Sequence, residues 1–185
     1  MCHQPPFRRS ECRTLRGEVL IPRAEVLGVG WTSDAYHFTS PNRETIVRAI
    51  RENDLTPVVY GGQDICFNSG PMISLDQLQA MYFPALRHAV SPLVEAGIDI
   101  IWHCDGDVRS LVPDLLDIGV EGFQGFQEES GCTLSHMASL MTRKGKKPIL
   151  IGSISVTTTL PYGTVDEVKQ DVERCFRTAG PIGFV

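Results

Sequence analysis

The sequence predicts an α/β fold with a parallel β-sheet, because short strand-like runs alternate with longer helical segments. From residue 57 onward, runs of β-branched and apolar residues recur about five times, and amphipathic segments separate them. This alternation is typical of βα units whose strands lie parallel in one sheet. The expected strands are residues 57–61, 98–103, 120–124, 148–153 and 182–185.

Helix signals between the expected strands support the same fold. Ser74 and Gln77 have the spacing of a capping box, in which two side chains satisfy unpaired backbone N–H groups at a helix start. Thr164 and Glu167 repeat this spacing, and Gly180 provides a stop for the helix that follows them. The apolar stripe of that helix consists of Val165, Val168, Val172, Cys175 and Phe176.

The sequence also predicts where helices are interrupted and where regular structure begins. Pro84 and Pro92 should kink or break the first of these helices, because proline lacks the backbone N–H that a helix interior needs. Another helix is expected over residues 40–53. Residues 1–40 show no sustained hydrophobic period, so the sequence predicts an irregular segment there, followed by one domain over residues 41–185.

The composition predicts a globular protein of the cytoplasm. The chain has 185 residues, 42% of them hydrophobic, and a net charge of −5, so it can bury a core and presents no broad positive field for nucleic acid. No apolar run approaches a signal-peptide core or a membrane span. Six scattered cysteines without a CxxC pair predict reduced thiols, and the glycine pairs do not extend to a nucleotide-binding loop.

The sharpest candidate site is the sequence HCDGD at the end of the second expected strand. His103 and Asp105 alternate with Cys104, so on an extended backbone their side chains point to the same side, within reach of one metal ion or one proton. Parallel α/β folds place reactive groups at the carboxyl ends of their strands. The alternative is that His103 packs in the core and Asp105 only caps the next helix.

Two other loops that follow expected strands carry polar candidates. The loop GGQDICFNSG, after the first strand, offers Asp64 and Ser69 as substrate-binding residues. The sequence FQGFQEESG, at the third strand, offers Gln124, Gln127, Glu128 and Glu129, which could supply an acid, a base or a ligand. Of these, Gln127 and Glu128 are the expected substrate-binding residues. The alternative is that these side chains are only solvated, as adjacent glutamates in loops often are.

Four blocks of the chain resemble, in order and spacing, the C-terminal half of proteins in the uroporphyrinogen decarboxylase superfamily. The blocks are GGQDICFNSGPMISLDQLQAMYFPAL, GIDIIWHCDGDVRSLVPDLLDIGVEGF, PILIGSISVTTTLPYGTVDEV and GPIGFV. The resemblance covers roughly residues 57–185. It implies a partial (β/α)₈ TIM barrel, about five βα units of the C-terminal half, with the active site at the carboxyl mouth of the strands.

The resemblance also implies a chemistry. In the methyltransferase branch, whose members work with corrinoid cofactors, a His-x-Cys motif binds zinc, which activates a thiol acceptor. The matching positions here are His103 and Asp105, so a carboxylate replaces the cysteine and a further ligand from a later loop would be needed. We therefore expect methyl transfer, with zinc at these two residues and a small molecule or a corrinoid on a partner protein as substrate.

Other interpretations stay open at this point. In the decarboxylase branch, which requires no metal, Ser69 would help hold the porphyrinogen, but Ser153 and Ser155 stand where those enzymes have asparagine and aspartate. A catalytically inactive fragment is another interpretation, since a whole barrel takes about 250 residues. Unpaired strand edges would then favour a homo-oligomer. The alternative fold is a five-stranded doubly wound sheet.

Overall fold

The protein is a mixed α/β structure built on one parallel sheet. The structure is a computed structural model, and it describes residues 12–13, 19–20, 43–180 and 183–184. Its main sheet has the strand order β3-β6-β7-β8-β9, and all neighbouring strands are parallel. The strands are β3 (Val58–Gly62), β6 (Asp99–Gly106), β7 (Gly122–Phe126), β8 (Ile149–Ile151) and the two-residue β9 (Gly183–Phe184). Each overlaps one of the five runs expected from the sequence, so the prediction of α/β class is confirmed.

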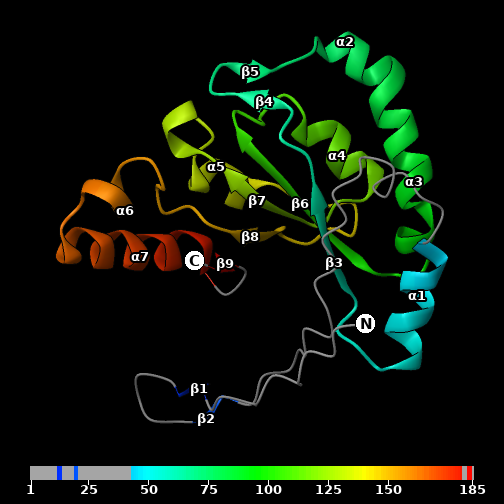
Figure 1. Cartoon of the computed structure of the whole chain (residues 1–185), viewed down its shortest axis with the longest axis horizontal. Helices are drawn as coiled ribbons and strands as arrows, with labels where there is room; N and C mark the ends of the chain where they lie inside the picture. The colour runs from blue at the N-terminus through cyan, green and yellow to red at the C-terminus, as the bar shows by residue number, and fades with distance from the viewer. Residues whose placement is uncertain (1–11, 14–18, 21–42, 181–182, 185) are drawn as a thin grey trace, which may run out of the picture.

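Helices connect successive strands and lie around the sheet (Figure 1). In chain order the helical elements are α1 (Arg43–Glu52), α2 (Leu75–Gln77), η1 (Leu78–Tyr82), α3 (Phe83–Glu95), α4 (Val112–Ile118), η2 (Glu128–Ser130), α5 (Leu134–Ser139), α6 (Thr159–Tyr162) and α7 (Val165–Ala179). The strand order follows the chain order without reversal, so each connection joins two neighbouring strands. A doubly wound sheet reverses its order at a switch point, and these five strands have no such reversal.

The hydrophobic core lies between the helices and one face of the sheet. On β6 the alternate residues Ile100, Trp102 and Cys104 are buried in this core. Phe123 pairs in register with Trp102, and Leu150 pairs with Phe123, so both point to the same face of the parallel sheet and join the same core. The helices contribute Phe83, Leu86, Val90, Leu93, Val112, Leu115, Ile118, Leu134, Met137, Cys175 and Ala179.

Two short antiparallel ladders are separate from the main sheet. β1 (Cys12–Arg13) pairs with β2 (Val19–Leu20) inside the segment expected to be irregular, and the rest of residues 1–40 lies outside the described residues. β4 (Cys66–Phe67) pairs with β5 (Gly70–Pro71) in the loop that follows β3. Strands of two residues leave no periodic signal, which is why the sequence did not predict either ladder.

Of the kink or break expected at Pro84 and Pro92, the break does not occur. α2, η1 and α3 follow one another without interruption from Leu75 to Glu95, and Pro92 lies inside α3. The missing N–H of Pro92 would leave the carbonyl of His88 without its helical donor, but the Ser91 hydroxyl donates to that carbonyl at 3.0 Å. The distortion appears earlier instead, as the π-helical turn η1 directly before α3, whose first turn contains Pro84.

The expected capping residues occupy the starts of their helices. Thr164 and Glu167 form a complete capping box at α7: the Glu167 N–H donates to the Thr164 hydroxyl, and the Thr164 N–H donates to the Glu167 carboxylate. At α2 the Gln77 N–H donates to the Ser74 hydroxyl. Gly180 follows α7 with φ 62°, a backbone angle that side-chain-bearing residues rarely adopt.

Only part of the apolar stripe of α7 is buried. Cys175 is completely buried in the core, whereas Val165 is 71% exposed and Phe176 is 53% exposed. The described part of the chain therefore covers the centre of this apolar stripe and leaves Val165 and Phe176 exposed. The remaining described cysteines of residues 43–180, Cys66, Cys104 and Cys132, are buried thiols as well.

Truncation of one core leucine tests this placement of the core. Leu115 of α4 is fully buried, so Leu115→Ala is expected to lower the free energy of unfolding by about 2–5 kcal/mol through the cavity that it leaves. Leu160→Ala removes the same atoms from a side chain that is 50% exposed, and it should lower the free energy by less than about 1 kcal/mol. Urea titration followed by circular dichroism measures both. Equal losses would contradict the described core.

Candidate functional site

The alternation along β6 points two polar side chains away from the core. Ile100, Trp102 and Cys104 pack under the helices. His103, which is partly exposed, and Asp105, which is exposed, occupy the intervening positions. Successive side chains of a strand point to opposite faces, so these two residues share the sheet face that the core does not use.

Asp64 joins this pair from the neighbouring strand. β3 and β6 are in register at Gly62 and His103, which brings the residues after β3 beside the carboxyl half of β6. Asp64 Oδ1 lies 3.2 Å from His103 Nε2 and accepts the backbone N–H of Asp105 at 3.1 Å. One ligand atom each from Asp64, His103 and Asp105 lies within 4.8 Å of the other two. We call these three residues the acidic triad.

A glycine on the third strand makes room for the acidic triad. Gly125 of β7 has φ +92°, and a Cβ atom there would lie 2.7 Å from His103 Nδ1 and 2.8 Å from Asp105 Oδ1. Real Cβ atoms essentially never approach other heavy atoms so closely. Any larger residue at this position would therefore displace the imidazole or the carboxylate.

Gln124 and Tyr60 hold the other side of the imidazole. Gln124 pairs in register with His103, and its Oε1 atom forms a hydrogen bond with His103 Nδ1. The Tyr60 hydroxyl of β3 donates to the same oxygen at 2.7 Å. The rings of Tyr60 and His103 lie with their centroids 6.0 Å apart. His103 is thus contacted by Asp64 at one ring nitrogen and by Gln124 at the other.

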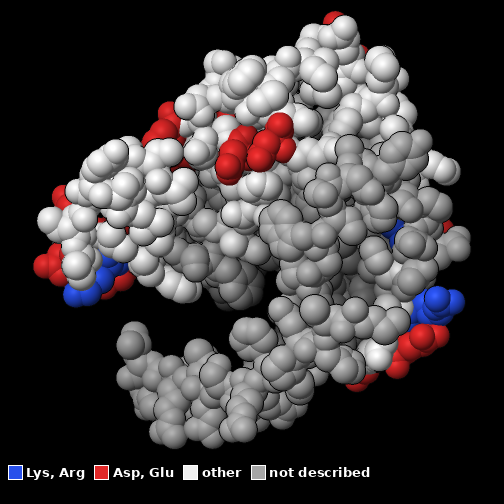
Figure 2. Space-filling view, in the orientation of Figure 1, with Lys and Arg blue, Asp and Glu red and all other residues white. Residues whose placement is uncertain are grey.

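Among the described residues, the surroundings of the acidic triad carry negative charge. Figure 2 shows acidic side chains gathered over the tip of β6, with no lysine or arginine visible beside them. Among the described residues, no lysine or arginine lies within ion-pair distance of Asp64 or Asp105. Burial raises the pKa of the Tyr60 hydroxyl, and the negative charges of Asp105 and Asp64 raise it further.

The nearest arginine along the chain is paired elsewhere. Arg109 binds Asp107 through its Nε and Nη2 atoms at 2.8 Å each. The hydrogen bond from Arg109 lowers the pKa of the Asp107 carboxyl, and its positive charge acts in the same direction. Asp107 is therefore held as a structural partner of Arg109, and the arginine does not neutralise the triad.

A shallow concavity borders the acidic triad. Its volume is about 640 Å³, and Asp105 forms part of its wall together with the candidate residues Ser69 and Gln127. Ser69 lies exposed in the turn between β4 and β5, and Gln127 Oε1 accepts the backbone N–H of Gly106 at 3.1 Å. The complete lining is Cys66, Phe67, Asn68, Ser69, Asp105, Gly106 and Gln127. Two of the four predicted substrate-binding residues thus line this concavity, and a third, Asp64, belongs to the triad.

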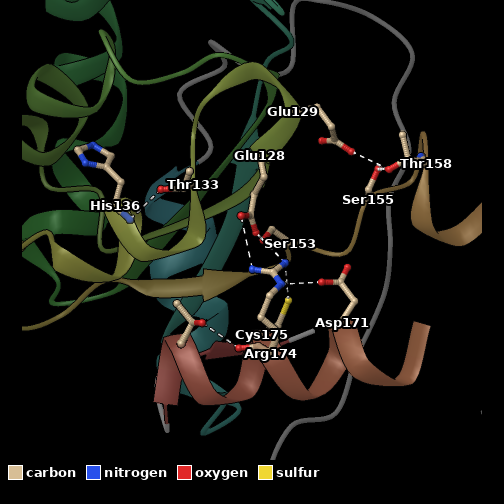
Figure 3. Close-up of polar contacts among 11 residues, drawn as sticks. Glu128, Glu129, Thr133, His136, Ser153, Ser155, Thr158, Asp171, Arg174 and Cys175 are labelled. Atoms are coloured by element: carbon tan, nitrogen blue, oxygen red, sulfur yellow. Dashed lines mark hydrogen bonds and ion pairs between the residues drawn. The ribbon is translucent and has the colours of Figure 1, made fainter. Parts of the chain in front are cut away.

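Glu128 has a different environment. Its carboxylate accepts the Ser153 hydroxyl and binds Arg174 of α7 at 2.9 Å (Figure 3). Arg174 also binds Asp171 at 2.7 Å. Burial lowers the pKa of Arg174, but the hydrogen bonds with Asp171 and Glu128 outweigh burial and raise it. Glu128 therefore joins the loop after β7 to α7, and its oxygens are occupied by this network.

Two contributors to the site, Tyr60 and Gly125, were not predicted from the sequence. They lie inside strands, where tyrosine and glycine have ordinary structural roles. Only the register of three strands brings them close to His103. Gln124 was a polar candidate of the sequence FQGFQEESG, but its contact with His103 depends on the pairing of β6 with β7.

Comparison with known proteins adds no relative. No family model, curated protein or solved structure matches the chain. Among the described residues, every helix is too short or too polar to cross a membrane. Functional conclusions therefore depend on the geometry of the site and on the resemblance described above.

The close approach at Gly125 can be tested by substitution. In Gly125→Ala the new methyl group should displace His103 and Asp105, since it would lie 2.7–2.8 Å from their side-chain atoms. Gly145→Ala is a matched control, because Gly145 also has a positive φ, +68°, but a Cβ added there would meet no atom within 4 Å. Proton–nitrogen NMR spectra should show shifts around His103 only for Gly125→Ala. Identical spectra at the triad in both variants would contradict the described packing.

Proposed function

We propose that the protein is a metal-dependent enzyme of the methyltransferase-like branch of the uroporphyrinogen decarboxylase superfamily, and that the acidic triad holds a zinc ion. The observation that carries this proposal is the convergence of Asp64, His103 and Asp105, whose ligand atoms lie within 4.8 Å of one another. Among the described residues, these two carboxylates have no lysine or arginine partner, and Asp64 contacts only the histidine of the triad, which favours a bound cation.

The donor set fits zinc. Zinc in proteins is bound by histidine nitrogen and carboxylate oxygen at about 2.0–2.2 Å, and catalytic sites use three protein ligands with one position left for water or substrate. The resemblance implied a further ligand from a later loop, and we propose instead that Asp64 supplies it from the earlier loop after β3. Asp64 is thus proposed as a metal ligand, where the sequence suggested a substrate-binding role.

The chain's own residues would position the reactants. A bound zinc ion would stabilise the thiolate of a methyl acceptor, and a corrinoid on a partner protein would supply the methyl group. The concavity beside Asp105 would receive the acceptor, with Phe67 offering apolar contact and Ser69 and Asn68 offering polar contact. An acceptor bound there would lie directly beside the acidic triad, because Asp105 belongs to both.

The strand order supports placing the chain in a (β/α)₈ barrel. In such barrels each strand pairs with the next one along the chain, and the helices cover only the outer face. The five described strands follow this order, and their shared core lies on one face. The acidic triad then lies at the carboxyl mouth of the proposed barrel, where the active sites of this fold lie.

The charge at the site favours methyl transfer over decarboxylation. A porphyrinogen carries several carboxylates, which bind best to arginine or lysine. The described lining of the concavity contains Asp105 and no basic residue, so a polyanionic substrate would be repelled. Ser69, which would hold the porphyrinogen in the decarboxylase branch, lies in the same acidic concavity.

Zinc binding is the first test. The purified protein should bind one zinc ion per chain in isothermal titration calorimetry, and Asp105→Asn or His103→Gln should weaken binding at least tenfold because each removes one ligand. Asp76→Asn makes the same carboxylate-to-amide change at the exposed start of α2 and should leave the affinity unchanged. Absence of zinc binding by the wild-type protein, or equal affinities in all variants, would contradict the metal site.

Methyl transfer is the second test. With zinc bound, the protein should transfer the methyl group of methylcobalamin to 2-mercaptoethanol, followed by the change in corrinoid absorbance and by mass detection of the methyl thioether. His103→Gln should abolish the transfer, and Asp76→Asn should retain it. Release of carbon dioxide from uroporphyrinogen, without methyl transfer, would instead support the decarboxylase alternative.

A further inference from the structure

We infer that Gln124 and Tyr60 are positioning residues that place the proton of the neutral His103 imidazole on Nδ1 and leave Nε2 facing Asp64. The importance of this tautomer for metal binding rests on the proposed function. The tautomer itself is a property of the metal-free protein and can be tested in that form.

The three side chains lie on neighbouring strands of one sheet face. Tyr60 of β3 and Gln124 of β7 flank β6, and the hydrogen bond between them crosses over β6 beside His103. The register fixes this arrangement, because His103 lies opposite Gln124 and Tyr60 lies opposite Ile101, two positions before His103. The backbone therefore determines which atoms meet.

The oxygen of Gln124 determines the tautomer. An amide oxygen only accepts hydrogen bonds, so its partner His103 Nδ1 must carry the hydrogen. The neutral imidazole then has its lone pair on Nε2, which lies 3.2 Å from Asp64 Oδ1. Two acceptor atoms that face each other at this distance repel, and a cation bound by both relieves the repulsion.

The hydrogen bond from Tyr60 stabilises the orientation in which the oxygen of the Gln124 amide faces the histidine. The Tyr60 hydroxyl and Gln124 Oε1 are 2.7 Å apart, a typical O–H···O separation. If the amide were reversed, its NH₂ group would face His103 Nδ1, and the imidazole hydrogen would move to Nε2 and bind Asp64. The Nε2 lone pair would then be lost to metal. A donor from Tyr60 favours the first orientation.

This arrangement matters for a metal ligand. A ligating histidine commonly donates its second ring N–H to an oxygen, which fixes the ring orientation and raises the basicity of the ligating nitrogen. Loss of such an outer partner typically lowers metal affinity ~10–100-fold. Among the described residues, the side-chain hydrogen bonds of Gln124 and Tyr60 reach the triad only at His103 Nδ1, so we infer that they act through His103.

The tautomer can be read directly by nitrogen-15 NMR of the metal-free protein at about pH 9, where an ordinary histidine is neutral. The His103 signals are assigned by their loss in His103→Gln. The wild-type protein should show hydrogen on Nδ1. Gln124→Leu should shift His103 toward hydrogen on Nε2, because Nδ1 loses the oxygen that accepts its hydrogen while Asp64 still accepts at Nε2. Gln124→Glu keeps an acceptor oxygen and should retain hydrogen on Nδ1.

Zinc affinity provides the second readout. Gln124→Leu should bind zinc ~10–100-fold more weakly than the wild type, and Gln124→Glu should restore most of the affinity. Tyr60→Phe should show a mixture of tautomers and an intermediate loss. Thermal denaturation confirms that each variant is folded, and Gln124→Glu keeps the test decisive if Gln124→Leu does not fold.

The outcomes separate this inference from the proposed function. Hydrogen on Nε2 in the wild type, or the same tautomer in Gln124→Leu, would overturn the inference even if zinc binds. Hydrogen on Nδ1 in a wild-type protein that binds no zinc would support the inference and would contradict the proposed function.

Discussion

The alternation of side chains along β6 is the constraint on which the rest of the structure depends. Ile100, Trp102 and Cys104 must face the helices to build the core, so His103 and Asp105 face the other way. A register shift of one residue would bury these two polar side chains and expose the core, which makes this register strongly specified. The buried face of the strand thus fixes the position of the polar face. The acidic triad is therefore a consequence of core packing on the opposite side of the same sheet.

The sequence predicted the local features well because they are encoded locally. Five apolar runs became five parallel strands, and Thr164 with Glu167 formed the expected cap. Of the kink or break expected at Pro92, the break does not occur, because a hydroxyl from the neighbouring Ser91 satisfies the carbonyl that proline leaves unpaired. This compensation depends on the side-chain torsion of Ser91, which the general rule that proline interrupts helices does not take into account. The irregular N-terminal segment falls mostly outside the described residues.

The site itself was only half visible in the sequence. His103 and Asp105 are two residues apart, so the period of a strand was enough to pair them. The contacts of Asp64 and Gln124 with His103 arise from strand pairing between distant segments, which single-sequence patterns do not reveal. Glu128 was a candidate because it follows β7, but its carboxylate is bound by Arg174 of α7. Long-range pairing therefore decided which polar residues gather around His103 and which are held in ion pairs.

A zinc ion held by the acidic triad would have a defined coordination shell, which X-ray absorption spectroscopy at the zinc edge of the zinc-loaded protein measures. The expected shell has one imidazole nitrogen and carboxylate oxygens at about 2.0–2.2 Å, with no sulfur. A scatterer at about 2.3 Å would indicate a thiolate ligand, and a shell without imidazole would exclude His103. Either result would contradict a metal site built from Asp64, His103 and Asp105.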